Sequence, residues 1–116
     1  MKQQIEMVDL GFSVADAEGI QFRHDGDDLL LEFVDWKESN ISVRCENAIG
    51  FKYQIGEYFI SDTERYDSCH IVKNSEWVKL LLSQGEAWDT EEWFHYKLNF
   101  NASGVVEVLC TKLTKT

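Results

Sequence analysis

Residues 93–113 read WFHYKLNFNASGVVEVLCTKL, and this stretch decides the fold because apolar and polar side chains alternate on both sides of a glycine-containing turn. Such alternation is typical of a β-strand with one buried face. A three-residue loop at 102–104, with Gly104 in the left-handed conformation, would close strands 93–101 and 105–113 as an antiparallel hairpin. The predicted pairs are Asn101 with Val105, Phe100 with Val106, Leu98 with Val108 and Tyr96 with Cys110.

The opposite face of this hairpin is polar and carries His95, Lys97 and Glu107. A one-residue slip would place Glu107 on the same side as Phe100, whereas a two-residue slip would keep every side chain on its face. We therefore expect an apolar face against the core and a polar face, including His95, in solvent.

A second hairpin is predicted around Asp25-Gly26, a dipeptide suited to a type I′ turn between strands 19–24 and 27–36. This register puts Phe22 and the leucines of the second strand on one face. The predicted pairs are His24 with Asp27, Arg23 with Asp28, Phe22 with Leu29 and Ile20 with Leu31.

Four further segments alternate as strands, namely 5–14, 40–46, 48–58 and 68–72. Gly50 and Gly56 lie on the phase opposite to the apolar residues of their segment, which indicates either bends or close approach to the backbone.

One helix is predicted over residues 75–84. Ser75 suits the N-cap, Glu76 lies in the first turn where the helix dipole favours an acid, and Gly85 suits the C′ position. Trp77, Leu80 and Leu81 recur at helical spacing. The helix precedes the C-terminal hairpin.

These elements predict one domain over residues 1–116, long enough to bury its own core. The fold class is α+β, mainly β: an antiparallel curved sheet or two-layer sandwich of six to eight strands, with the helix plugging one end.

The chain is acidic, with 21 Asp and Glu against 11 Lys and Arg and a formal net charge of −10. This charge repels nucleic acid and anionic membranes and favours a basic protein partner, although solubility alone would also explain it. No apolar stretch approaches the ~18 residues of a membrane span, and no signal peptide is evident. The odd set Cys45, Cys69 and Cys110 agrees with free thiols in the cytoplasm.

Catalytic and cofactor motifs such as GxSxG, GxGxxG, the P-loop and HExxH are absent. Adjacent Cys69 and His70 would point to opposite faces of a strand, so they cannot act as a nucleophile and base pair. Acidic groups such as Asp62, Glu64 and Asp67 are expected in solvent. We expect neither enzyme activity, nor a metal, nor a cofactor.

The segment between helix and hairpin, GEAWDTEEW at 85–93, places two tryptophans among four carboxylates. Large aromatic rings among acids suit recognition of a basic partner, because the rings supply contact area and attract cations. In the alternative interpretation, both tryptophans cover the end of the core. The predicted partner-binding residues are Glu86, Trp88, Asp89, Glu91, Glu92 and Trp93.

Two patterns carry a resemblance to a known family: the helix start N-S-x-W at 74–77 and the hairpin H-Y-x-L-x-F followed by G-x-x-E-V at 95–108. Together with residues 66–81, they resemble the C-terminal half of small bacterial proteins grouped with the immunity proteins of polymorphic or contact-dependent toxin systems. The resemblance implies an antidote that binds and blocks a toxin without enzymatic activity.

Two functions follow as hypotheses. The first is an immunity-like inhibitor of a basic protein. The alternative is a small-molecule-binding domain or minor enzyme that uses a sheet face lined by Trp36, Phe51 and Tyr53.

Overall fold

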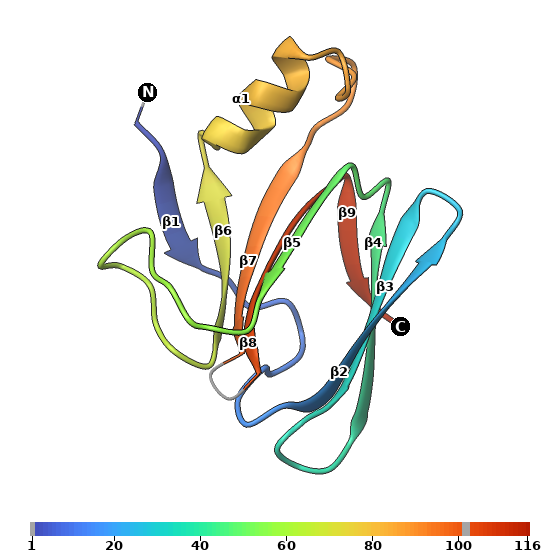
Figure 1. Cartoon of the computed structure of the whole chain (residues 1–116), viewed down its shortest axis with the longest axis vertical. Helices are drawn as coiled ribbons and strands as arrows, with labels where there is room; N and C mark the ends of the chain where they lie inside the picture. Colours follow the sequence, from blue (N-terminus) through green and yellow to red (C-terminus); the bar gives the residue numbers. More distant parts are fainter. Residues whose placement is uncertain (1, 101–102) are drawn as a thin grey trace.

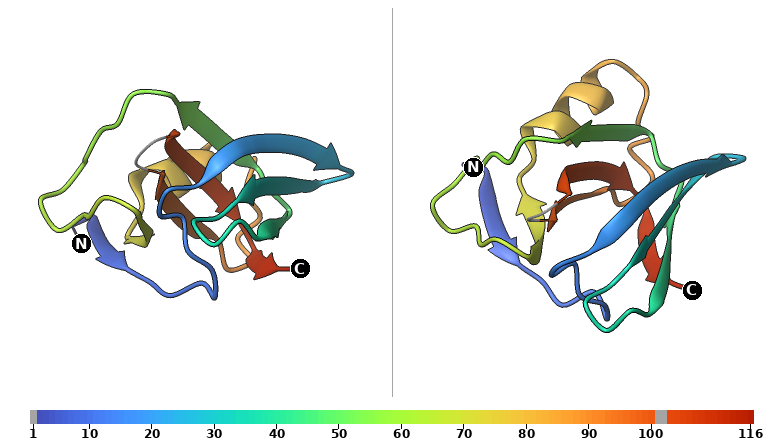
Figure 2. Two further views of the ribbon diagram at one scale, coloured as in Figure 1. Left: turned by 90° about the horizontal axis from the view of Figure 1, so that it is seen from below. Right: turned by 60° about the horizontal axis from the view of Figure 1, so that its bottom comes forward.

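The computed structural model describes residues 2–100 and 103–116, which form two packed antiparallel sheets and one helix (Figures 1 and 2). The mainly-β fold class and the helix before the C-terminal strands are confirmed. The five-stranded sheet has the order β1-β6-β7-β8-β5, and the four-stranded sheet has the order β2-β3-β4-β9. The elements are β1 (Gln4–Met7), β2 (Glu18–Asp25), β3 (Asp28–Val34), β4 (Asn40–Glu46), β5 (Gly50–Gln54), β6 (Ser68–Lys73), α1 (Glu76–Ser83), β7 (Phe94–Phe100), β8 (Gly104–Cys110) and β9 (Lys112–Lys115).

Two long, bent segments join the sheets at one corner. Strand β4 continues into β5 and strand β8 into β9, and each segment leaves one sheet and enters the other. Backbone hydrogen bonds hold the corner, from Thr111 N to Glu46 O at 2.9 Å and from Ile49 N to Leu109 O at 3.0 Å. The predicted strand 105–113 is therefore two strands, because corners between packed sheets form where a strand bends from one sheet to the other.

The first hairpin has the predicted facing but a different register. Phe22 lies opposite Leu31 instead of Leu29, and Asp25 pairs with Asp28, so the turn residues are Gly26-Asp27. Only Gly26 of these two has a positive φ, at 63°. A positive φ at the first turn residue alone is the pattern of a type II′ turn, so the predicted type I′ turn is wrong.

The C-terminal hairpin differs in the same way. Leu98 pairs with Val106 and Tyr96 with Val108, a shift of two residues from the predicted pairs. The predicted partner Asn101 and loop residue Ala102 lie outside the described residues. Gly104 has a φ of 100°, as predicted for a left-handed residue, and a Cβ there would lie 2.2 Å from the Gln54 carbonyl oxygen.

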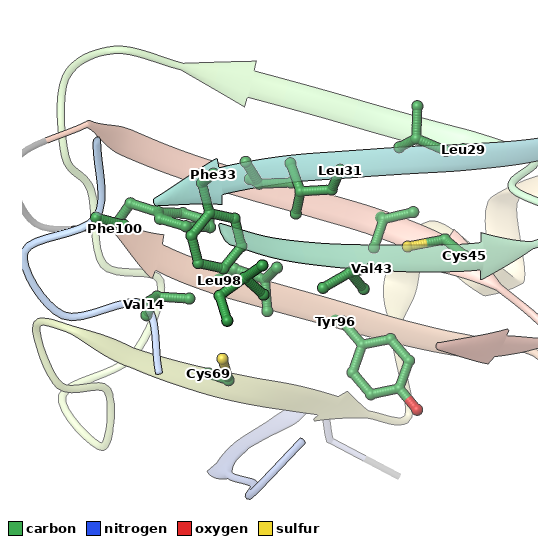
Figure 3. Packing of buried hydrophobic residues seen from close by; sticks show 14 of the residues in the cluster. Val14, Leu29, Leu31, Phe33, Val43, Cys45, Cys69, Tyr96, Leu98 and Phe100 are labelled. Carbon is green, nitrogen blue, oxygen red and sulfur yellow. The ribbon is translucent and has the colours of Figure 1, made fainter. Parts of the chain in front are cut away.

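The core lies between the inner faces of the two sheets (Figure 3). Phe33 of β3 meets Phe100 of β7 edge to face, with ring centroids 5.1 Å apart. Cys110 is fully buried there, where a thiol acts as a small hydrophobe. Other fully or nearly fully buried members are Val14, Leu29, Leu31, Ile41, Val43, Cys45, Cys69, Leu98, Val106 and Val108.

Two predicted strands are shorter than expected. The N-terminal strand ends at Met7, and residues 8–17 run as irregular chain into the core, where Val14 and Ala17 are buried. The strand predicted over 48–58 spans only Gly50–Gln54, and residues 55–67 form a long loop. Residues 8–12 alternate between half-buried and exposed side chains without forming a strand, whereas residues 51–57 are all exposed, so their sequence alternation does not reflect alternating burial.

Helix α1 has the predicted ends. The Ser75 hydroxyl accepts from Val78 N at 3.1 Å, and Gly85 has a φ of 77°. The helix lies over the outer face of the five-stranded sheet (Figure 2), where the Trp77 ring rests on Gly50. A Cβ at Gly50 would lie 2.7 Å from this ring, which explains the predicted close approach. Among the described residues, no helix has the length and apolar character to cross a membrane.

Candidate functional site

The predicted partner-binding residues lie in the irregular segment between α1 and β7, at the end of the molecule where the β2–β3 turn also lies (Figure 1). The Trp88 side chain is 67% exposed, and Glu86, Asp89, Glu91 and Glu92 are also exposed. Trp93 is half-buried. Its Nε1 donates to the Trp88 carbonyl at 2.8 Å, which fixes the indole ring against the segment that carries Trp88.

Part of this segment closes a cavity of about 440 Å³ with the β2–β3 turn and the β4–β5 connection; we call it the indole cavity. Two indoles and three carboxylates face it. Asp89 and Glu92 do not line it, so the structure divides the predicted residues between different sides of the segment. The residues lining the indole cavity are His24, Gly26, Asp27, Asn47, Ala48, Ile49, Gly85, Glu86, Trp88, Glu91 and Trp93.

The second wall of the indole cavity was not predicted from the sequence. Arg44 binds the carboxylates of Asp25 at 2.9 Å and Asp28 at 2.7 Å, so those two charges are paired. The hydrogen bonds to Asp28 from Asn47 N and from Arg44 lower the pKa of this carboxyl. Asp27, between them, has no ion pair among the described residues and lines the cavity.

The largest correction concerns the outer face of the five-stranded sheet. His95, Lys97 and Glu107 were expected in solvent, and Glu64 was expected in an exposed acidic cluster; all four are buried. Loop 55–67 and helix α1 cover this face. The alternation correctly separated the polar from the apolar side chains, but the polar face is an internal layer.

Lys97 is the centre of one half of this layer and is fully buried. Its Nζ donates to the Glu64 carboxylate, to Tyr58 O at 2.8 Å and to Asn99 Oδ1 at 3.1 Å. Glu64 also accepts from the backbone N–H groups of Ile60 at 2.6 Å and Ser61 at 3.0 Å. The ion pair therefore fastens loop 55–67 to β7.

His95 and Glu107 form the other half. His95 Nε2 lies 2.6 Å from Glu107 Oε1, and Tyr58 OH donates to Oε2 of the same carboxylate. Because a carboxylate can only accept, Nε2 carries the hydrogen, and Nδ1 can accept from the Ser75 hydroxyl at 2.7 Å.

The Ser75–His95–Glu107 order resembles that of a nucleophilic triad, but Ser75 is buried and already caps α1. The chain of hydrogen bonds thus joins α1, β7, β8 and loop 55–67. A groove of about 550 Å³ opens over His95 and Glu107, but the hydrogen-bonding groups at its base bind one another.

His70 belongs to the same layer. Its Nε2 accepts from Arg65 N at 3.1 Å, while Nδ1 is buried without a hydrogen-bond partner in the described structure. Cys69, the adjacent residue, points into the core, so the two side chains lie on opposite faces of β6, as predicted. His24 is exposed, as expected.

The folded protein is expected to lose stability as the pH falls from about 7 to about 4. Burial raises the pKa values of Glu64 and Glu107, but hydrogen bonds, chiefly from Lys97 and His95, lower them by more, to below the ordinary 4.5. Burial lowers the pKa of His70 below 6.5. A group with a lowered folded pKa stabilises the protein above its unfolded pKa, and this stabilisation is lost as the pH falls through the folded pKa.

Urea unfolding at a series of pH values measures this dependence. The loss should begin below about pH 6.5 and steepen below about pH 4.5. His70→Gln should remove the first part of the loss, and an unfolding free energy that stays constant from pH 7 to 4 would contradict the prediction.

The three cysteine thiols all lie in the interior of the protein. Cys45, Cys69 and Cys110 are free and buried, and burial raises the pKa of Cys69 to about 12. Within residues 2–100 and 103–116, no group of three or more His, Cys, Asp or Glu side chains could hold a metal ion.

Two of the aromatic residues of the alternative hypothesis lie together. Phe51 and Tyr53 pack on Phe22 of β2, with ring centroids 4.8 and 5.0 Å apart, and both remain partly exposed. Trp36 lies in the β3–β4 turn, with Lys37 over its ring. Compared with protein-family models, with curated proteins and with solved structures, this chain matches none.

Proposed function

We propose that this protein is a non-enzymatic cytoplasmic binding protein that inhibits a basic partner, a toxin in the manner of an immunity protein. The observation that carries the proposal is the exposed Trp88 ring among the carboxylates of Glu86, Asp89 and Glu91. An exposed tryptophan bordered by acids and a cavity suits the anchor of an interface.

Charge supports the same partner. The net charge of −10 would attract a basic protein before contact, and it opposes binding to nucleic acid or anionic membranes. The free thiols agree with a cytoplasmic site of action. Inhibition would work by covering the active surface of the partner. Electrostatic attraction would speed encounter, and Trp88, once buried in the interface, would slow dissociation.

The test uses the C-terminal domain of a large secreted protein encoded beside this gene, if one is present, as the purified probe. Charge reversal at Glu91 and Glu92 should mainly slow association and weaken its dependence on salt. Trp88→Ala should mainly speed dissociation and cost about 2 kcal/mol or more of binding free energy. Stopped-flow or surface-plasmon kinetics at several salt concentrations separate the two effects.

Circular dichroism and thermal melting must show that each variant is folded. Trp36→Ala is the matched control, because Trp36 is also an exposed tryptophan but lies in the β3–β4 turn. If charge reversal at Glu91 and Glu92 and Trp88→Ala all leave binding unchanged in folded protein, the partner docks elsewhere.

A further inference from the structure

Lysines of this chain bind aromatic rings in three places. Two of these lysines are exposed and one is buried. The pairs are Lys37 over Trp36 at 5.1 Å, Lys52 over Trp77 at 4.1 Å and Lys97 over Tyr58 at 4.6 Å, each measured from Nζ to the ring centroid.

The indole cavity has the same chemistry without the cation. Trp88 and Trp93 supply aromatic surface, and Asp27, Glu86 and Glu91 supply carboxylates. No lysine or arginine is among the described residues that line it. A cation from another molecule would complete here the same cation–aromatic contact that the three lysines make within the chain.

The cavity walls are held in place before any ligand enters. The Trp93 indole is fixed by its hydrogen bond to Trp88 O, and Ala48 N donates to Asp27 O at 2.9 Å, which ties the β2–β3 turn to the β4–β5 connection. Its volume of about 440 Å³ lies in the range of small-ligand pockets. A preformed site loses less conformational entropy on binding.

We propose that the indole cavity receives an arginine side chain of the bound partner. The inference rests on the proposed function and names the group that the partner inserts. A guanidinium is planar, stacks on indole rings and can bind a carboxylate through two N–H groups, whereas a lysine ammonium offers a single strongly hydrated point charge. The combination of two indoles with three carboxylates therefore favours arginine.

The test needs no partner and uses Nα-acetyl-arginine amide as the probe. Titration of ¹⁵N-labelled protein at about pH 7.5 should shift the indole N–H resonances of Trp88 and Trp93, with a dissociation constant in roughly the millimolar range for a ligand of this size. The resonances of Trp36 and Trp77 serve as internal controls and should move little. The neutral isostere, Nα-acetyl-citrulline amide, should give no saturable shift, and the lysine analogue should bind at least about threefold more weakly.

A pair of double variants separates the cavity from overall charge. Glu86→Gln/Glu91→Gln should weaken arginine binding by about tenfold, because both carboxylates line the cavity. Glu57→Gln/Asp62→Asn also removes two negative charges, but from exposed residues of loop 55–67 that do not line the cavity, and it should leave binding within about twofold.

Equal effects of the two double variants, or equal shifts with arginine and citrulline probes, would overturn the inference. A partner that still binds through Trp88 would in that case leave the proposed function standing. If arginine binds at the cavity but Trp88→Ala does not change binding of the partner, the proposed function is contradicted instead.

Discussion

Lys97→Met is expected to lower the free energy of unfolding by about 3–5 kcal/mol. The substitution keeps most of the buried side-chain volume but leaves the Glu64 carboxylate in the interior without its cation. Asn99 and two backbone N–H groups still bind Glu64, and they cannot neutralise its charge. Urea unfolding followed by tryptophan fluorescence measures the loss.

The ion pair between Lys73 and Glu6 provides the matched control, because its atoms are 2.8 Å apart and both side chains are about half exposed. Lys73→Met should change stability by no more than about 0.5–1 kcal/mol. Adding Glu64→Gln to Lys97→Met removes the unpaired charge and should restore at least about 2 kcal/mol. Equal costs for Lys97→Met and Lys73→Met would show that the buried layer is not held by this pair.

Phe100→Ala is expected to cost about 3–5 kcal/mol of unfolding free energy. The ring is fully buried and packs edge to face on Phe33, so its removal leaves a cavity between the sheets in addition to the lost transfer energy. Phe100→Leu fills most of this space and should cost about half as much. Thermal and urea unfolding give both values.

Ile55→Ala is the control for this second series. Ile55 is also a large apolar residue, but 80% of its surface is exposed, so its truncation should change stability by less than about 0.5 kcal/mol. If Phe100→Ala unfolds too readily for measurement, Phe100→Leu and Ile55→Ala still compare a core with a surface site. Similar losses for these two variants would contradict the placement of Phe100 in the core.

The two hairpins show what alternation in a sequence can and cannot predict. Phe22, Leu98 and Phe100 lie on the predicted faces, yet both registers differ from the predicted ones by two residues. A slip of two residues returns every side chain to its own face, so the hydrophobic pattern does not distinguish the registers. The turns decided them: Gly26 occupies the first turn position in one hairpin, and Gly104 pairs with Phe100 in the other.

The helix was predictable because all its signals are local, whereas the polar layer depended on distant segments. Ser75 and Gly85 mark the helix ends within a few residues of it. Burial of Lys97 and Glu107 requires loop 55–67, which is separated from them by more than 30 residues and has no repeating pattern.

In the candidate site, too, one part could be predicted from a local sequence pattern and the other part could not. The acidic, tryptophan-rich composition of segment 85–93 was evident from the sequence. The opposite wall of the indole cavity, formed by the β2–β3 turn and residues 47–49, depends on the corner between the sheets, which no local pattern predicts.

The corner at Thr111 has a consequence for how the chain acquires its structure during synthesis. Strand β8 lies between β7 and β5, and β9 completes the edge beside β4, so both sheets lack neighbours until residues 104–115 have been made. Pairing of 40–54 with 104–115 spans about 60 residues, and such distant contacts form late and slowly. We expect the nascent chain to remain without its core while the ribosome still holds β8, which leaves Phe33 and the β4 edge open to chaperones until β8 has emerged.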